Sequence, residues 1–253
     1  MKNKKEINSC IIIIGNEILS GRTKDLNTST LSKWLNSIGI RVAESRTIPD
    51  VEKIIVNTVQ ELKQKYDYVF TSGGIGPTHD DITAESLSKA FDLKYEIHKD
   101  AYKLLEKYYG VEEFNEGRQK MAWMPSNANL ILNPSSGAPG FFIENVFCLP
   151  GVPLILESMI PGLTNKLVGG DPILSKTISL NTIESEIAKS LKTVQEKNKD
   201  VDIGSYPFFR KGKIGVSIVL RSKDQSKIDI CNLQILDFVK EKNIVIIERD
   251  ENV

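Results

Sequence analysis

Cysteine and histidine are scarce in this sequence, which has three cysteines and two histidines among its 253 residues. Cys10, Cys148 and Cys231 are odd in number and stand singly in apolar stretches, so we expect buried free thiols rather than disulfides or a metal site. With only His79 and His98 available, a zinc centre that depends on histidine is not expected. Any metal ion should therefore be held by oxygen atoms, as magnesium or manganese prefers.

Long apolar runs and an excess of charge of one sign are also missing. The longest apolar run, residues 10–14, is far shorter than the roughly 20 residues of a transmembrane helix. The first residues lack the apolar core of a signal peptide, so we expect a cytoplasmic protein with no membrane partner. The 33 basic and 33 acidic residues balance, so no broad basic face is expected to hold nucleic acid.

Strand-like and helix-like patterns alternate along the first part of the chain. Residues 11–14 form a continuous aliphatic run, which is typical of a strand buried on both faces. Apolar residues at helical spacing follow in residues 31–38 and 54–62, and residues 68–71 are again strand-like. These units predict an α/β fold with a mostly parallel sheet, helices on both faces, and ligands at the carboxyl ends of the strands.

Further elements are expected before residue 150. Residues 101–109 and 121–124 are predicted to be helical, whereas 130–132 and 141–148 are predicted to be strands, the latter segment folding back on itself. Trp123 is expected to pack in the core; the alternative is that it lines a pocket for a flat ring.

The segment with the clearest chemistry is residues 68–90, which read YVFTSGGIGPTHDDITAESLSKA. A strand, a glycine-rich turn and a helix that begins near residues 81–83 form an anion site, because glycine lets the backbone approach a ligand and free N–H groups point at it. Asp80 and Asp81 lie beside that site and would repel a phosphate unless a divalent cation lay between them. The segment therefore predicts metal-assisted chemistry on a phosphate or diphosphate.

Simpler explanations stand beside this one. One of Asp80, Asp81 or Thr83 is an N-cap candidate for the helix, and the glycines are also ordinary turn residues. The segment is neither a Walker A loop nor a Gly-x-Gly-x-x-Gly dinucleotide loop. The convergence of three loops favours a site, because residues 15–17 and Asp50 also follow predicted strands and should lie at the same edge of the sheet.

The pattern changes after a linker at residues 169–172. Strands are expected at 176–180, 201–209, 213–221 and 244–247, and helices at 184–198 and 228–242. This βαββαβ order predicts a smaller α+β domain, KH-like or ferredoxin-like, so the two domains are 1–168 and 173–253. The Gly-x-x-Gly at residues 212–215 lies between two strands, so we interpret it as a hairpin turn and not as the RNA-gripping loop of a KH domain.

Residues 73–83 resemble the signature loop of the molybdopterin-binding (molybdenum cofactor biosynthesis) domain superfamily. Further resembling segments occur in the family's order, at residues 15–19, 25–27, 48–50, 133–134, 137–141 and 149–153. The GNE, THDD and GAPGF sequences resemble in particular the N-terminal region of CinA-like (competence/damage-inducible protein A) proteins, which eukaryotic FAD synthases also carry. One departure is the LILESM sequence of residues 154–159, where the family usually has Ser-Glu-Met, and it leaves the role of Glu157 open.

The resemblance and the glycine turn together give the candidate site. Asp81, with Asp80 or Asp50, would hold a divalent cation (magnesium, manganese or cobalt) and carry the catalysis, with no organic cofactor required. The candidate ligand-binding residues are Gly15, Asn16, Glu17, Asp25, Asn27, Thr71, Gly73, Gly74, Gly76, Pro77, Thr78, Thr83, Gly137, Pro139, Gly140, Pro150 and Gly151.

The function that the resemblance implies is metal-dependent hydrolysis of a nucleoside diphosphate linkage, as in ADP-ribose or FAD. The first alternative is adenylyl transfer to molybdopterin, because Asp50 and Asp81 match the two acidic positions of molybdopterin-handling relatives. A second alternative is a catalytically silent nucleotide or pterin sensor. The resemblance also implies a homodimer, with a trimer as the alternative, and we expect the small domain to pack against a first domain without binding nucleic acid.

Overall fold

The computed structural model describes residues 6–210 and 213–250. The chain divides into two compact units, with the division between Gly170 and Asp171, inside the predicted linker. Gly169 and Gly170 pack closely on the carbonyl groups of Ile38 and Gly39, so this part of the linker belongs to the first unit.

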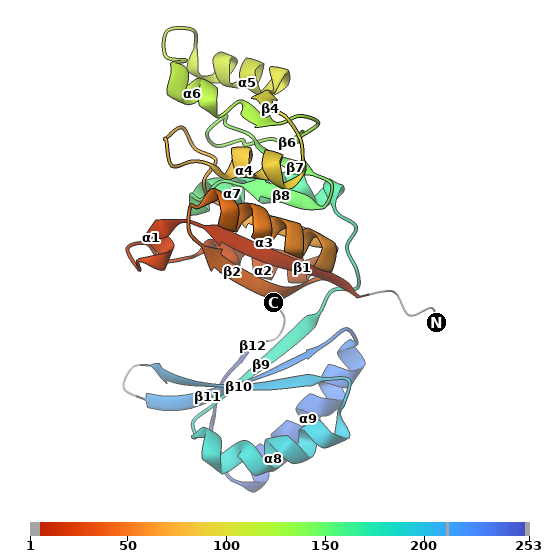
Figure 1. Cartoon of the computed structure of the whole chain (residues 1–253). Helices are drawn as coiled ribbons and strands as arrows, with labels where there is room; N and C mark the ends of the chain where they lie inside the picture. Colours follow the sequence, from red (N-terminus) through yellow and green to blue (C-terminus); the bar gives the residue numbers. More distant parts are fainter. Residues whose placement is uncertain (1–5, 211–212, 251–253) are drawn as a thin grey trace. The chain divides into compact units, whose positions relative to one another are not determined.

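The first unit is built on a six-stranded sheet with the order β2-β1-β3-β8-β7-β6 (Figure 1). Four strands run parallel to their neighbours and the last two are antiparallel, which confirms the predicted mostly parallel sheet. The strands are β1 (Ile7–Ile14), β2 (Ile40–Ile48), β3 (Tyr68–Ser72), β6 (Asn129–Ile131), β7 (Gly140–Ile143) and β8 (Val146–Leu149).

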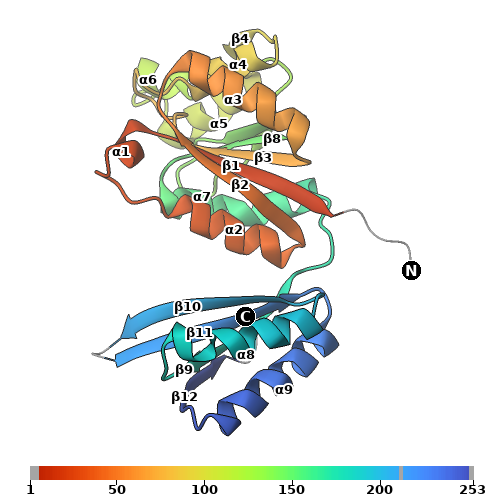
Figure 2. The ribbon, with the colours of Figure 1, turned by 60° about the horizontal axis from the view of Figure 1, so that its bottom comes forward.

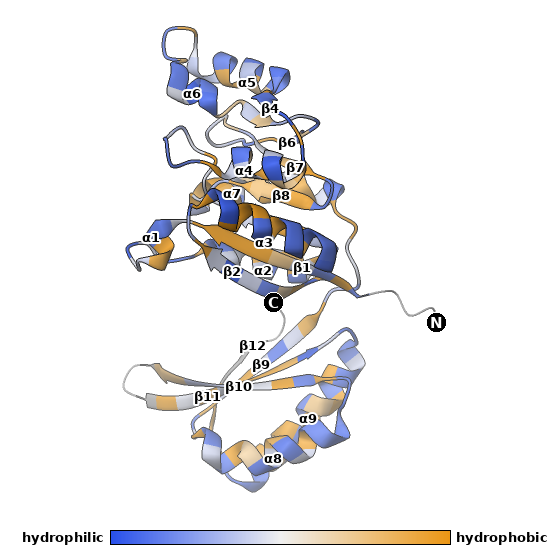
Figure 3. Ribbon diagram, in the orientation of Figure 1, coloured by the Kyte–Doolittle hydropathy of each residue, from blue (hydrophilic) through white to orange (hydrophobic). Residues whose placement is uncertain are grey.

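Helices cover both faces of this sheet because its strands are apolar on both faces. On β1, Ile12 and Ile14 pack in one core and Ile11 and Ile13 in the other, as the two-residue period of a strand requires. The first core is closed by α3 (Glu52–Lys65), α4 (Thr83–Ala90) and α5 (Lys99–Tyr109), the second by α2 (Asn27–Ser37), α7 (Pro153–Met159) and the 3-10 segment η1 (Ile160–Lys166). Figure 3 shows the hydrophobic colour concentrated in β1 and β8.

One predicted helix is wrong. Residues 121–124 do not continue a helix; instead α6 (Glu116–Lys120) ends before them, and β5 (Trp123–Pro125) pairs antiparallel with β4 (Tyr95–Ile97). The pairing joins segments about thirty residues apart, and Pro125 disfavours a helical conformation of Met124 before it. Trp123 is therefore a strand residue with 38% of its surface exposed, and the prediction that it packs in the core is wrong.

The second unit has the order β9 (Leu174–Leu180), α8 (Glu184–Lys197), β10 (Asp202–Arg210), β11 (Lys213–Ser222), α9 (Gln225–Glu241) and β12 (Ile246–Asp250). Its antiparallel sheet has the order β10-β11-β9-β12, and one apolar core joins the sheet to both helices (Figure 2). This is the predicted βαββαβ arrangement in its ferredoxin-like form. Lys211 and Gly212 of the predicted hairpin turn lie outside the described residues; the strands that flank them pair antiparallel up to Arg210 and Lys213.

Cys10, Cys148 and Cys231 are buried free thiols, as predicted. Burial raises the pKa of the Cys10 and Cys148 thiols to about 12, so both stay protonated at neutral pH. Within the described residues, no helix combines the length and the apolar character needed to cross a membrane.

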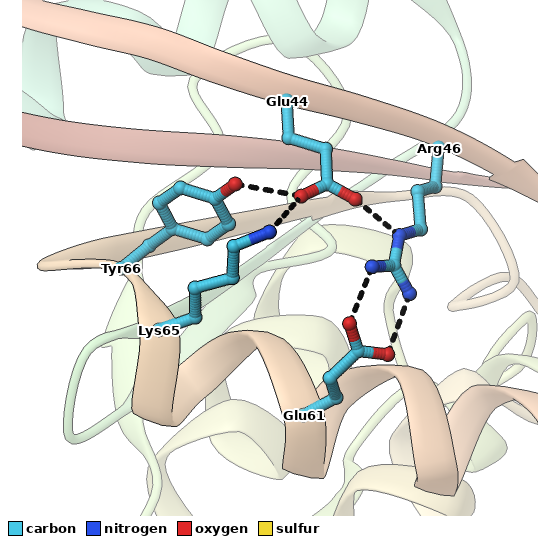
Figure 4. A network of polar contacts seen from close by, with 5 residues as sticks. All are labelled: Glu44, Arg46, Glu61, Lys65 and Tyr66. Atoms are coloured by element: carbon cyan, nitrogen blue, oxygen red, sulfur yellow. Dashed lines mark hydrogen bonds and ion pairs between the residues drawn. The ribbon is translucent and has the colours of Figure 1, made fainter.

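A polar network ties the edge strand β2 to α3 (Figure 4). The Arg46 guanidinium donates to both carboxylate oxygens of Glu61, at 2.7 and 2.5 Å, and to Glu44 at 2.5 Å. The Glu44 carboxylate also accepts from Lys65 at 2.8 Å and from the Tyr66 hydroxyl at 2.6 Å. These hydrogen bonds from Lys65, Tyr66 and Arg46 lower the pKa of Glu44 from 4.5 to about 2.

The lowered pKa of Glu44 predicts a pH-dependent contribution to stability. A carboxylate whose pKa falls on folding stabilises the native state above its unfolded pKa, and that contribution is lost as the pH falls from about 4.5 toward about 2. We expect Glu44→Gln to lower the free energy of unfolding at pH 6 by no more than about 1 kcal/mol, since the network is partly exposed. The difference from wild type should shrink toward pH 2.5, as measured by urea unfolding.

The matched control is Glu113→Gln, which removes an exposed ion pair with Arg118 and should leave stability nearly unchanged at both pH values. A Glu44→Gln effect of the same size at pH 6 and pH 2.5 would contradict the prediction.

Candidate functional site

The glycine loop after β3 has a conformation that only glycine adopts without strain. Gly73 has a φ of +112° and Gly74 a φ of +69°. A Cβ atom on Gly73 would lie 2.1 Å from the carbonyl oxygen of Ile14, at the end of β1. The loop therefore lies directly against the end of the neighbouring strand, as the predicted convergence of loops requires (Figure 1).

Three successive backbone N–H groups of this loop are unused. The N–H of Gly73 donates to the carbonyl of Leu149 at 3.1 Å, so Gly73 completes the sheet and is not the phosphate donor that we predicted. The N–H groups of Gly74, Ile75 and Gly76 have no acceptor in the part of the chain that the structure describes. Successive free N–H groups in a turn are able to bind an anion, so the available donors are those of Gly74, Ile75 and Gly76, with Ile75 in place of Gly73 in the predicted set.

Asp80 and Asp81 both interact with Thr78. One Asp81 carboxylate oxygen accepts from the Thr78 N–H at 2.8 Å and from its hydroxyl at 2.6 Å, and the same hydroxyl contacts Asp80 at 2.5 Å. The hydrogen bond from Thr78 lowers the pKa of Asp80 and keeps it ionised. The helix α4 has Ile82 as its N-cap, so the alternative that an aspartate or Thr83 is only the cap is wrong.

The third predicted metal ligand, Asp50, has a separate partner. Its carboxylate accepts from the backbone N–H of Asn16 at 2.8 Å, which ties the end of β2 to the end of β1. Among the described residues, no three histidine, cysteine or acidic side chains are close enough to share a metal ion. The predicted set of Asp50, Asp80 and Asp81 is therefore not assembled as one metal cluster.

The Asp80–Asp81 pair still fits a magnesium-like cation. Such ions take oxygen ligands and are often held by one or two carboxylates together with phosphates of the substrate. Each of the two carboxylates has one oxygen without a hydrogen bond from Thr78. These two residues could therefore hold a cation that the substrate itself completes.

Asn27 connects several loops at the edge of the sheet where the glycine loop lies. Its side-chain amide donates to the Ser72 hydroxyl at 2.9 Å and to the Gly151 carbonyl at 2.7 Å, while its own oxygen is buried and accepts no hydrogen bond from the described residues. A Cβ on Gly151 would lie 3.3 Å from the Gly73 α-carbon. Pro150 takes part through its carbonyl, which accepts from the Ser72 hydroxyl at 3.1 Å. These residues position the glycine loop.

Other predicted binding residues have structural surroundings. Thr71 and Thr83 are fully buried, so their side chains do not face solvent, and the Thr83 hydroxyl lies 2.2 Å from where a Cβ of Gly74 would be. Gly140 lies inside β7, where a Cβ would come within 2.5 Å of the Cys148 carbonyl. Gly137 lies against the ring of Tyr108, only 2.4 Å from where its Cβ would be.

The first loop is likewise held by local contacts. The Glu17 carboxylate lies over Gly15, 2.5 Å from where a Cβ of that glycine would be, within the segment that forms the short helix α1 (Asn16–Leu19). Asp25 accepts from the Thr28 N–H at 3.1 Å in the first turn of α2. Figure 1 shows α1 and the loop before α4 at the same end of the strands.

A hollow of about 310 Å³ opens beside Asp81 and contains residues that the sequence analysis missed. It is lined by His79, Asp81, Ile82, Glu85, Tyr95, Lys120 and Trp123. A narrower continuation shares four of these residues and reaches Ile75, Gly76 and Pro139. The volume lies at the lower end of the range of small-molecule sites.

Lys120 is the cation of this hollow. Its ammonium group donates to the Thr78 carbonyl, 42 residues earlier in the sequence, and forms no ion pair among the described residues. Pro77, in the glycine loop, lies close to Gly117 of α6. The residues around Lys120 in the sequence do not predict that it lies in this site, because its position depends on the contact between α6 and the glycine loop.

Comparisons with known proteins follow the division into two units. Residues 10–168 match a family described as "Probable molybdopterin binding domain", and residues 172–248 match one described as "FAD synthase, middle domain". A protein of Archaeoglobus fulgidus is 35% identical over 217 residues, which cover 86% of this chain and 92% of that protein. A protein of Saccharolobus islandicus is 30% identical over 253 residues, which cover 93% and 96%.

A solved structure is also similar to the first unit. The crystal structure of the protein CinA with unknown function from Thermoplasma acidophilum has 32% sequence identity and a TM-score of 0.60. The similarity covers 64% of this chain and 99% of that chain. The relatives together cover both units, and the described glycine loop lies inside the first matched family region.

Proposed function

The chain belongs to the family of the probable molybdopterin binding domain, in a CinA-like form, and from that premise we propose that its first unit hydrolyses a nucleoside diphosphate linkage such as that of ADP-ribose. The observation that supports the proposal is the close placement of three kinds of group. Asp81 and Lys120 line the hollow, Ile75 and Gly76, whose N–H groups are free, line its narrow part, and Gly74 and Asp80 adjoin these residues in the same loop.

The charges of these groups complement a diphosphate that binds together with a cation. Backbone N–H groups and Lys120 would donate hydrogen bonds to phosphate oxygens. The two carboxylates alone would repel the same oxygens, so their presence favours a ligand that brings a divalent cation. A bound cation would offset the charge of the diphosphate and acidify a water molecule for the attack.

The proposed reaction is balanced without any further reactant. The oxygen of water attacks one phosphorus atom of ADP-ribose, and the bond from that phosphorus to the bridging oxygen breaks. The products are AMP and ribose 5-phosphate, and the proton of the attacking water is released to solvent. The loop N–H groups and Lys120 would hold the phosphate oxygens on which charge increases during this step.

Adenylyl transfer to molybdopterin is the second candidate, and one observation favours it. Residues 73–83 contain no lysine or arginine, which by itself argues against a strong grip on a triphosphate. Lys120 supplies such a cation from α6. A non-catalytic nucleotide or pterin sensor uses the same groups for binding alone.

Product analysis separates these candidates. Incubation of the full chain with ADP-ribose and Mg²⁺, Mn²⁺ or Co²⁺ is expected to release AMP without any second substrate, as measured by chromatography. Incubation with ATP and molybdopterin is expected to release no pyrophosphate above the level without molybdopterin. Molybdopterin-dependent pyrophosphate release without cleavage of ADP-ribose would reverse the order of the two candidates, and binding without any turnover would favour the sensor.

We propose that the ligand is a nucleotide or pterin and that the chain forms a homodimer in solution. The small unit, similar to the middle domain of FAD synthase, is proposed to have no RNA-binding role.

A further inference from the structure

Trp123 and Tyr95 form an aromatic wall in the hollow beside the glycine loop. Their ring centroids are 5.4 Å apart with an interplanar angle of 47°. Both rings come from the small β4–β5 sheet, and Met124, next to Trp123, is fully buried. Burial of the Met124 side chain thus holds β5 in place, while Trp123 keeps 38% of its surface exposed.

The polar groups of the hollow lie beside this wall. Lys120 and Asp81 line both the wide part and the narrow part, and the narrow part is also lined by Ile75 and Gly76, whose N–H groups are free. An aromatic wall with a few convergent polar groups is typical of a site for a flat ring. The Lys120 ammonium has three donors and one of them is used by the Thr78 carbonyl, so two are available for a phosphate.

We propose that this hollow is the base subsite, in which Trp123 stacks on the purine ring of the nucleotide and Lys120 binds the phosphate attached to that nucleoside. This inference rests on the proposed function for the placement of the diphosphate at the glycine loop. It adds the part of the ligand that the loop does not recognise, and it assigns substrate selection to Lys120 and Trp123, which lie outside the glycine motif.

Binding of AMP tests the subsite independently of catalysis, because AMP has no diphosphate linkage. The sequence has two tryptophans, and Trp34 packs against Phe70 in the core below the sheet. In a Trp34→Phe variant, fluorescence therefore reports Trp123 alone. We expect saturable quenching by AMP and no quenching by ribose 5-phosphate, which has the phosphate without the ring.

Two substitutions divide the site into its ring and phosphate parts. By calorimetry, Trp123→Ala should weaken AMP binding about tenfold to a hundredfold, and Trp123→Phe should recover part of the loss. Lys120→Met should weaken AMP binding but leave adenosine binding unchanged, because adenosine has no phosphate. Thermal unfolding of each variant checks that the fold is intact.

The outcomes distinguish this inference from the proposed function. Quenching by AMP without cleavage of ADP-ribose would retain the subsite and contradict the hydrolase. Cleavage of ADP-ribose with an unchanged KM in Trp123→Ala would overturn the subsite and retain the hydrolase. A pterin monophosphate is the third ligand of the titration; quenching by it but not by AMP would overturn the assignment to a purine.

Discussion

Replacing Asp81 by asparagine is expected to reduce the turnover of ADP-ribose by about a hundredfold or more while leaving the fold intact. Asp81 lines the hollow and is one of the two carboxylates that could hold a cation beside the free N–H groups. The amide oxygen of asparagine can still accept the hydrogen bond from Thr78, so the loop keeps its shape. Steady-state rates and thermal unfolding of the same preparation measure both effects.

Two other aspartates serve as matched controls. Asp80→Asn should have a smaller effect than Asp81→Asn, because Asp80 contacts the Thr78 hydroxyl and is not among the described residues that line the hollow. Asp50→Asn changes a residue that holds the Asn16 N–H in this conformation. Equal, large losses of activity in Asp50→Asn and Asp81→Asn would indicate that binding of the substrate brings Asp50, Asp80 and Asp81 together around one cation. Full activity of Asp81→Asn would contradict the proposed role of Asp81.

Replacing Gly73 by alanine is expected to lower the free energy of unfolding by about 2 kcal/mol or more and to abolish ligand binding. Alanine is strained at a φ of +112°, and its Cβ would lie 2.1 Å from the Ile14 carbonyl oxygen. Either the loop or the end of β1 must move, and the free N–H groups of residues 74–76 move with it. Urea unfolding and an AMP titration measure the two consequences.

Gly21→Ala is the control for strain without a clash. Gly21 has a φ of +73°, but no atom lies within 4 Å of an added Cβ. This variant should lose about 1 kcal/mol from the backbone conformation. A Gly73→Ala variant that is no less stable than Gly21→Ala would contradict the close packing of the loop on Ile14.

The parallel core of the first unit could be predicted because its pattern is local. The aliphatic run at residues 11–14 and the helical spacing of the next segments determine buried strands and amphipathic helices with no need for distant partners. The edge at which the loops meet follows from the same pattern, since parallel strands place their carboxyl ends together.

For Trp123 the sequence left two alternatives open, a core position and a position in a ring pocket, and it gave no indication of Lys120, because both positions depend on contacts between segments that are not adjacent in the sequence. Residues 121–124 are apolar in a way that suits a helix as well as a strand, and pairing with residues 95–97 decides between the two. Lys120 becomes a site residue through a bond to Thr78, which no spacing in the sequence indicates. Likewise, the loss of Gly73 as a donor depends on its bond to Leu149 in a neighbouring strand.

The most direct measurement of the central proposal is phosphorus NMR of ADP-ribose incubated with the full chain, with and without divalent cations. After incubation with Mg²⁺, Mn²⁺ or Co²⁺ and chelation of the ion with excess EDTA, which removes the line broadening by paramagnetic Mn²⁺ and Co²⁺, the diphosphate signals are expected to be replaced by those of AMP and ribose 5-phosphate in equal amounts. With EDTA present from the start, the diphosphate signals should persist. They should begin to decrease once excess divalent cation is added. Cleavage at an unchanged rate in EDTA, or no cleavage with any of the three cations, would contradict the proposal that this site hydrolyses a nucleoside diphosphate with the help of a cation.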